Sequence, residues 1–231
     1  MNTLLGRASS LLIGLATAIV IVTVAVLPFL TPQWIGFEQG RADATAWTGY
    51  SVDELKMATD GILSDLVFGP PAFDIEVRGE AVLGERERGH MRDVRSIFGG
   101  LWVLAAVSVV VLRVASRRRD KVAAWRAARR GALGLAGAIV VLGAVALVAF
   151  RALFELFHRM LFPAGSYTFD AGSERLVQLF PFQFWQETAI AVGVVIVVLA
   201  LLVAVVAGRR AAGAAQPVVG AEPVAVPEPG R

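Results

Sequence analysis

The fold is decided by residues 97–150, IFGGLWVLAAVSVVVLRVASRRRDKVAAWRAARRGALGLAGAIVVLGAVALVAF, in which two long apolar runs enclose a basic segment. A helix crosses the core of a lipid bilayer with about 20 predominantly apolar residues. The runs at 97–115 and 131–150 have this character, and neither alternates between apolar and polar residues as a membrane β-strand would. They predict two transmembrane helices that are joined by a basic loop at 116–130.

Two further apolar runs, at 11–30 and 190–207, complete a set of four. Hydrophobic residues make up 56% of the 231-residue chain, and its mean hydropathy is +0.66, which is too apolar for an ordinary soluble domain. Helices satisfy their backbone polar groups within one segment, as the lipid core requires. The sequence therefore predicts an all-α membrane protein, a four-transmembrane-helix bundle.

The first 30 residues allow two interpretations, an uncleaved anchor or a cleaved secretory signal. The apolar run is about 20 residues long and leads into Pro28-Phe29-Leu30, where a signal peptide would carry a small-x-small cleavage site. These features favour a cytoplasmic N-terminus followed by a permanent first transmembrane helix.

The distribution of Lys and Arg predicts the orientation of the bundle. Loops that are rich in these residues stay in the cytoplasm, and residues 116–130 contain seven of them. Four crossings then place both termini in the cytoplasm, in agreement with Arg7 and Arg209 at the membrane ends. We expect a multi-pass protein of the cytoplasmic membrane, with a disordered cytoplasmic tail at 208–231 that is rich in Ala, Pro, Gly and Val.

The segment at 31–96 faces the outside in this topology and is too long for a plain connection. Ser51-Val52-Asp53-Glu54 has the spacing of a capping box, which predicts a helix from Val52 to about Leu66. Gly69-Pro70-Pro71 would end this helix, and the alternation of residues 73–78 predicts one short strand. We therefore expect a small extracytoplasmic α+β cap.

The second outer segment, 151–189, contains seven phenylalanines and two Leu-Phe-Pro triplets. This composition predicts an interfacial segment whose aromatic side chains face lipid. The third helix is expected to continue past Phe150, with a polar stripe of Glu155, His158 and Arg159, and to raise His158 about 10 Å above the hydrocarbon edge.

Composition also excludes several functional classes. The chain has no cysteine, which rules out disulfides, thiol catalysis, iron–sulfur clusters and cysteine-ligated zinc. Its pI of 9.9 reflects basic residues at membrane ends, a pattern typical of contact with anionic membrane lipid and not of nucleic-acid binding. Two histidines with carboxylates can hold zinc, but the compact spacing of known sites is missing, so we expect no metal and no cofactor.

The only two histidines, His90 and His158, both fall just outside apolar runs on the predicted outer side. Imidazole is the side chain best suited to proton transfer near neutral pH, and two imidazoles at one depth can form a single site. Taken singly, each histidine is better explained as a structural hydrogen-bonding residue, which is the usual role of a lone histidine at the end of a membrane helix.

The surroundings of His90 in the sequence favour the functional interpretation. Met91 and Val94 share its helical face, which would turn His90 toward the bundle. Glu87 and Asp93 lie three positions away on either side and are placed to orient the imidazole. The alternative is that this charged run is a solvated, internally paired start of the second transmembrane helix.

The run GERERGHMRDVR at 84–95, together with His158, Leu161-Phe162-Pro163, Thr168-Phe169 and Leu179-Phe180-Pro181, resembles the bacterial lipoprotein intramolecular transacylases. The resemblance extends from the first transmembrane helix to the fourth. It implies a four-helix membrane protein with an extracytoplasmic cap, in which each histidine motif gives one catalytic residue. The site residues that it implies are the catalytic His90 and His158, and we expect Glu87, Asp93, Arg95 and Tyr167 to support them. The family commonly has tryptophan in place of Tyr167.

Such enzymes move the sn-2 acyl chain of a diacylglyceryl lipoprotein to the α-amino group of its N-terminal cysteine, which gives a lyso-form lipoprotein. The resemblance thus implies this lipoprotein as substrate and an active site on the extracytoplasmic face. An α-amino group has a pKa near 8 and needs a base. We expect His90 to be that base and His158 to stabilise the oxyanion or donate a proton, and the reverse assignment is open.

Two other functions are compatible with the predicted topology. A non-enzymatic membrane scaffold or sensor would use the cap as a binding surface. A proton-linked transporter is less well supported, because relay groups normally lie at the centre of transmembrane helices and these runs carry no ionisable residue there.

Overall fold

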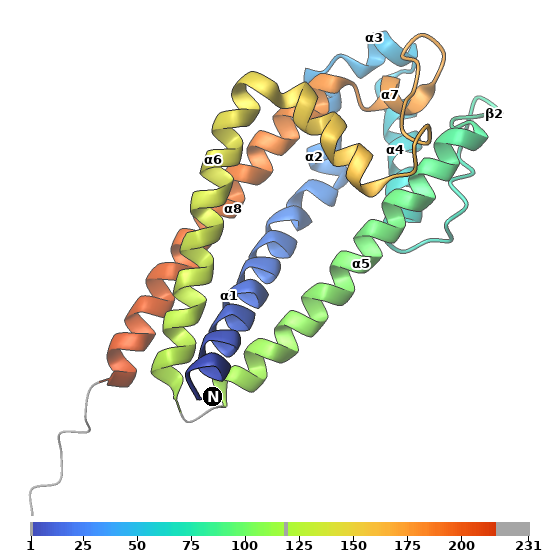
Figure 1. The fold of residues 1–231 in the computed structure, drawn as a ribbon. Helices are drawn as coiled ribbons and strands as arrows, with labels where there is room; N and C mark the ends of the chain where they lie inside the picture. Colours follow the sequence, from blue (N-terminus) through green and yellow to red (C-terminus); the bar gives the residue numbers. More distant parts are fainter. Residues whose placement is uncertain (1, 118–119, 216–231) are drawn as a thin grey trace, which may run out of the picture.

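Four long helices form the body of the protein, as the sequence predicts (Figure 1). The computed structural model describes residues 2–117 and 120–215, with side chains from residue 6 onward. The four helices are α1 (Asn2–Val26), α5 (Glu85–Ser116), α6 (Lys121–Leu161) and α8 (Phe182–Ala215). Each is long and apolar enough to cross a membrane.

Small residues hold the bundle together. Ala132 and Ala136 of α6 pack against Ala200 and Ala204 of α8, and all four are buried. In lipid the hydrophobic effect does not draw helices together, so small side chains stabilise a bundle by allowing backbones to approach closely. The backbones of α1 and α6 also approach closely, since a Cβ on Gly131 would lie 2.3 Å from the Gly14 carbonyl oxygen.

The remaining elements gather at the end of the bundle away from the N-terminus and form the predicted cap (Figure 1). Its elements are the 3-10 helix η1 (Leu27–Leu30), the helices α2 (Pro32–Arg41), α3 (Ala44–Thr48), α4 (Val52–Val67) and α7 (Arg175–Leu179), and the strands β1 (Glu76–Val77) and β2 (Glu80–Ala81). The two strands pair antiparallel, with Glu76 opposite Ala81.

The capping box predicted from the sequence is present at the start of α4. Glu54 N donates to Ser51 Oγ at 3.3 Å, and Ser51 N donates to Glu54 Oε2 at 2.8 Å. The helix ends at Val67, close to the predicted end. Its buried face, which includes Leu55 and Ile62, joins the core of the cap.

The strand predicted at 73–78 is shorter than expected and has a partner. Phe73 has a φ of 51°, which interrupts an extended run at its first residue. Arg78 and Gly79 have φ values of 59° and 80°, the positive pair that a tight type I′ hairpin turn requires. The result is a two-stranded hairpin with two residues in each strand.

Three of the long helices differ from the sequence predictions in their bounds or their course. The α5 helix begins at Glu85, so the charged run is a regular part of the helix that carries the apolar run from Ile97. The α6 helix does continue to Leu161, but it bends at Ala149, where φ is −133° and ψ is 28°. The α8 helix continues to Ala215, so the prediction of disorder is wrong for 208–215. The rest of the predicted tail, 216–231, lies outside the described residues.

The aromatic residues of 151–189 do not all face outward as expected. Phe162, Phe180 and Phe184 are buried, and the last two pack in the cap core. Phe157 and Trp185 are exposed on the protein surface. The expectation of a uniformly lipid-facing aromatic segment is therefore wrong, because part of it completes the core of the cap.

Candidate active site

The structure brings the two histidines together. The ring centroids of His90 and His158 are 6.0 Å apart, and the ring planes differ by 22°. His90 lies near the start of α5, and His158 lies near the end of α6. Side chains that are 68 positions apart in the chain thus form one stacked pair at the cap end of the bundle.

The bend in α6 is what brings His158 to this place. Figure 1 shows that the part of α6 beyond the bend crosses over toward α5 instead of continuing along the bundle. The expectation that His158 simply rises above the membrane on a straight helix is therefore wrong. After the bend, the segment that carries His158 runs across the end of the bundle toward His90.

His90 lies in an aromatic enclosure and is 7% exposed. The rings of Phe162 and Phe169 lie 4.6 Å and 5.4 Å from its own ring, centroid to centroid. Its Nδ1 atom is buried and makes no hydrogen bond to any described residue. A buried nitrogen without a partner is unfavourable by about 1–3 kcal/mol, so it marks a position where a ligand group can bind.

Burial also controls the charge of His90, which precedes the membrane-spanning run at 97–115. Desolvation, aided by the nearby His158, lowers the pKa of His90 to about 4, and the Asp93 carboxylate partly opposes this shift. His90 is therefore neutral near pH 7 and presents an uncharged imidazole to the site.

His158 is half-buried, and its orientation is fixed by its own helix. Its Nδ1 lies 2.7 Å from the carbonyl oxygen of Phe154. Because a carbonyl oxygen only accepts, Nδ1 must carry the hydrogen, and Nε2 of the neutral ring then has a free lone pair. The side chain lies among the rings of Phe154, Phe157 and Tyr167, at 4.3, 5.3 and 5.4 Å, and not in the polar stripe that the sequence suggested.

Glu87 is placed differently from the sequence prediction. Both of its carboxylate oxygens accept backbone N–H groups at 2.6 Å, one from Gly84 and one from Leu176. Within the described residues it makes no hydrogen bond to His90. Glu87 therefore fixes the start of α5 to α7, and it supports His90 by holding the helix and not by orienting the imidazole.

The other predicted supporting residues lie around the pair at different distances. Asp93 acts on His90 through its charge. Arg95 donates a hydrogen bond to the carbonyl oxygen of Asp65 and so ties α5 to α4. Tyr167 stacks near His158. Of the four, Tyr167 and Asp93 are close enough to influence the imidazoles directly.

Sequence reasoning missed the residues that enclose His90. Phe162 and Phe169 belong to the motifs Leu161-Phe162-Pro163 and Thr168-Phe169, which we interpreted as interfacial. Arg86 was also missed: its guanidinium lies 5.4 Å over the Phe169 ring and donates to the Thr168 carbonyl oxygen at 2.5 Å. The two-residue spacing between Tyr167 and Phe169 is the one local signal that could have indicated two rings on one side.

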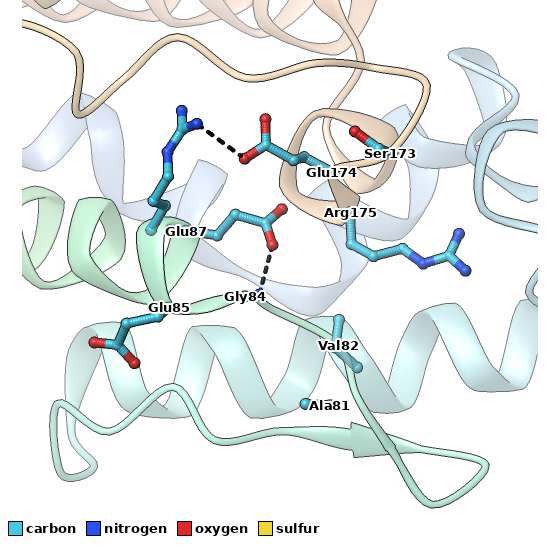
Figure 2. Close-up of a pocket in the computed structure, with 9 residues that line it drawn as sticks. Ala81, Val82, Gly84, Glu85, Glu87, Ser173, Glu174 and Arg175 are labelled. Atoms are coloured by element: carbon cyan, nitrogen blue, oxygen red, sulfur yellow. Dashed lines mark hydrogen bonds and ion pairs between the residues drawn. The ribbon is translucent and has the colours of Figure 1, made fainter.

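A hollow of about 490 Å³ lies beside the site, between the start of α5 and the residues that precede α7 (Figure 2). Its wall includes Arg86 and Glu174, which form an ion pair at 3.8 Å, and Glu87, which binds Gly84. Neither histidine lines it. Arg86, which lines the hollow, lies over the Phe169 ring, and Phe169 in turn contacts His90. The hollow is therefore a neighbour of the histidine pair and not part of it.

The arrangement combines two imidazoles with different capacities inside an apolar wall. A neutral, buried imidazole can donate a hydrogen bond to a developing oxyanion, and an imidazole with a free Nε2 can accept a proton. Both functions are strengthened where water is excluded. These are the requirements of acyl transfer without an enzyme nucleophile.

The comparisons with known proteins agree with the fold and with the resemblance found in the sequence. The model of the family lipoprotein intramolecular transacylase Lit matches residues 9–185. A structure of the membrane integral lipoprotein intramolecular transacylase Lit from Bacillus cereus matches with a TM-score of 0.76 at 17% identity, over 90% of this chain and 97% of that chain.

Two structures of variants of the same Bacillus cereus enzyme, in which one histidine is replaced by arginine or by alanine, also match. Their TM-scores are 0.67 and 0.66 at 17% identity, and the matches cover 92% of this chain and 94% or 96% of those chains. Among curated proteins, none matches the chain. The family match covers more than half of the chain, so this protein belongs to the lipoprotein intramolecular transacylases, a family of multi-pass membrane acyltransferases.

Proposed function

We propose that His90 and His158 are the catalytic pair of this transacylase. The proposed substrate is a diacylglyceryl lipoprotein, whose sn-2 acyl chain moves to the α-amino group of the N-terminal cysteine. The observation that carries the proposal is the stacked pair itself. The ring centroids are 6.0 Å apart, and Nδ1 of the buried His90 has no hydrogen-bond partner among the described residues.

The two environments favour a division of roles that is the reverse of the one expected from the sequence. His158 is the better base, because its Nδ1–H is bound to Phe154 O and its Nε2 is free. His90 is the better hydrogen-bond donor to an oxyanion, because burial lowers its pKa to about 4 and keeps it neutral. A neutral histidine with a lowered pKa can polarise a carbonyl without giving up its proton.

The reaction then proceeds with all protons accounted for. His158 Nε2 removes a proton from the amine as the amine nitrogen attacks the carbonyl carbon of the sn-2 ester. His90 donates a hydrogen bond to the oxyanion of the tetrahedral intermediate. The intermediate collapses, the ester C–O bond breaks, and His158 returns its proton to the departing glycerol oxygen. The products are an amide on the cysteine nitrogen and a free sn-2 hydroxyl.

Both reacting groups belong to one substrate molecule, which reduces what the protein must supply. Well-oriented intramolecular reactions gain about 7–11 kcal/mol from effective molarity. The aromatic rings around His90 and His158 provide an apolar surface on which the glyceryl and acyl groups can lie. Orientation and proton transfer together are sufficient, without a serine or cysteine nucleophile.

We place this site on the extracytoplasmic face of the cytoplasmic membrane, with both termini in the cytoplasm. The end of α5, followed by Arg117, and the start of α6 at Lys121 lie at the end of the bundle opposite the cap (Figure 1). Since basic loops stay in the cytoplasm, the cap and the histidine pair face the side on which lipoproteins are displayed.

The test is the position of the acyl chain in a reporter lipoprotein produced with each variant. Alkali cleaves O-esters but leaves an N-acyl amide intact, so mass spectrometry of the alkali-treated N-terminal peptide measures the transfer. His90→Ala and His158→Ala should each reduce N-acylation about 100-fold or more. Met91→Leu, a volume-conserving change at the buried neighbour of His90, is the matched control and should remain active.

The roles can be separated with asparagine variants. His90→Asn keeps a hydrogen-bond donor near the position of Nδ1, whereas His158→Asn has no basic nitrogen. His90→Asn should therefore retain clearly more activity than His158→Asn. Equal loss in both variants would contradict the division of roles, and near-normal activity of either alanine variant would contradict the pair.

A further inference from the structure

A second site lies at the other end of the bundle, between α6 and α8. A groove of about 420 Å³ separates the two helices there. Leu133, Leu201 and Val205 form its apolar part and are 40–52% exposed. Arg129 and Arg209 stand at its edge, one on each helix.

Arg129 and Arg209 have no polar partner within residues 2–117 and 120–215. Neither makes a hydrogen bond or an ion pair to a described residue. Asp120 is the one acidic residue within 116–130 and 208–215, and its carboxylate already accepts the Ala123 N–H at the start of α6. The groove therefore carries two positive charges that the described part of the chain does not neutralise.

The shape of the groove brings one arginine across it. A Cβ added to Gly208 would lie 3.4 Å from Arg129 Nε and 3.5 Å from its Cδ. The Arg129 side chain thus lies against the bare backbone of α8, close to the next residue, Arg209. Two guanidinium groups on facing helices, above an exposed apolar surface, form a binding site for an anion that carries a hydrocarbon chain.

We propose that this groove binds an anionic phospholipid of the leaflet opposite the histidine pair. Arg129 and Arg209 would hold the phosphodiester, for which the guanidinium fork is well suited. One acyl chain would lie along Leu133, Leu201 and Val205. Lipids of net negative charge are favoured over zwitterionic ones because the two arginines add an excess of positive charge, and the cytoplasmic leaflet is rich in such lipids.

Native mass spectrometry of the full chain in detergent tests the site, with dioleoyl phosphatidylglycerol and dioleoyl phosphatidylcholine as probes. The wild-type protein should retain phosphatidylglycerol more strongly than phosphatidylcholine. Each arginine at an anionic group contributes about a fivefold gain in affinity, so Arg129→Gln/Arg209→Gln should weaken phosphatidylglycerol binding about 25-fold. Transacylase activity, which depends on the distant histidines, reports that the variant is folded.

The matched control is Arg126→Gln/Arg210→Gln, which removes the same charge from the same two helices outside the groove. It should retain the lipid. Gly208→Leu keeps both arginines but fills the groove. Like the Arg129→Gln/Arg209→Gln variant, it should bind phosphatidylglycerol more weakly than the wild-type protein. The proposal is overturned if the wild-type protein binds both probes equally, or if the control pair loses as much binding as Arg129→Gln/Arg209→Gln. It is also overturned if Gly208→Leu binds phosphatidylglycerol as well as the wild-type protein, or if glycerol phosphate displaces the lipid.

Discussion

Replacement of His90 by phenylalanine is predicted to stabilise the protein while abolishing acyl transfer. The imidazole is 7% exposed and lies against Phe162 and Phe169, and its Nδ1 has no partner in the part of the chain that the structure describes. Removing a buried unsatisfied polar atom relieves about 1–3 kcal/mol, and the slightly larger phenyl ring offsets part of this gain. We expect His90→Phe to be about 1 kcal/mol more stable at pH 7.5.

Acidification should widen the difference in stability between His90→Phe and the wild-type protein. The pKa of His90 is about 4 in the folded protein against an ordinary value of 6.5, so between these values the unfolded chain binds the proton and the folded protein does not. Above pH 6.5 the titration of His90 therefore takes nothing from the stability of the wild-type protein. As the pH falls toward 4, protonation of His90 in the unfolded chain lowers the free energy of unfolding. At 1.36 kcal/mol per tenfold change, the loss is at most about 2 kcal/mol at pH 5 and about 3 kcal/mol at pH 4. His90→Phe lacks this loss.

Thermal unfolding in detergent micelles, followed by tryptophan fluorescence at pH 7.5 and pH 5, measures both effects. A change of 1 kcal/mol corresponds to about 2–4 °C for a chain of this size. His158→Phe is the control, because His158 is half-buried and its Nδ1 already donates to Phe154 O, so no gain is expected. The reasoning is refuted if His90→Phe melts at a lower temperature than the wild-type protein at pH 7.5. It is also refuted if the melting temperature of His90→Phe falls between pH 7.5 and pH 5 as steeply as that of the wild-type protein.

Two further predictions concern the packing that holds the site. Glu87→Ala leaves the amides of Gly84 and Leu176 without their charged acceptor and should destabilise the cap by about 3 kcal/mol; hydrogen exchange at these two amides should rise, and unchanged protection would contradict the assigned contacts. Gly131→Leu places a side chain where a Cβ would lie 2.3 Å from the Gly14 carbonyl oxygen, whereas Gly134 has open space. Gly131→Leu should therefore lower the folded yield in size-exclusion chromatography, and Gly134→Leu should not; equal yields would show that α1 and α6 can separate without loss.

The membrane helices and the side on which both histidines lie were predictable because the bilayer restricts the possible folds. Apolar runs of sufficient length must be helices in lipid, and charge at their ends predicts orientation. Two histidines just beyond such runs then fall on one predicted side, whereas their contact depends on the bend in α6. The capping box of α4 was predictable because its two hydrogen bonds join residues only three positions apart.

The bend at Ala149 and the contacts of Glu87 were not predictable from local sequence. Alanine is a strong helix former, and neither proline nor glycine accompanies it at the bend, so only packing against the rest of the protein explains the change in direction. Glu87 binds an amide 89 residues away, a distance over which spacing rules carry no information. Hydropathy also could not separate Phe180 and Phe184, buried in the cap, from aromatic residues that face lipid, because both environments are apolar.

The bend at Ala149 has a consequence for how the two imidazoles keep their spacing. His90 lies 26 residues before Ser116, whereas His158 lies 37 residues after Lys121. Straight helices would leave the two side chains about 16 Å apart in height, at about 1.5 Å per residue. Because of the bend, the last part of α6 runs sideways toward α5 instead of farther along the bundle. The spacing of the imidazoles therefore depends on the number of residues in each helix, and deletion of one residue between the basic end of either helix and its histidine would rotate that histidine by about 100° away from the other.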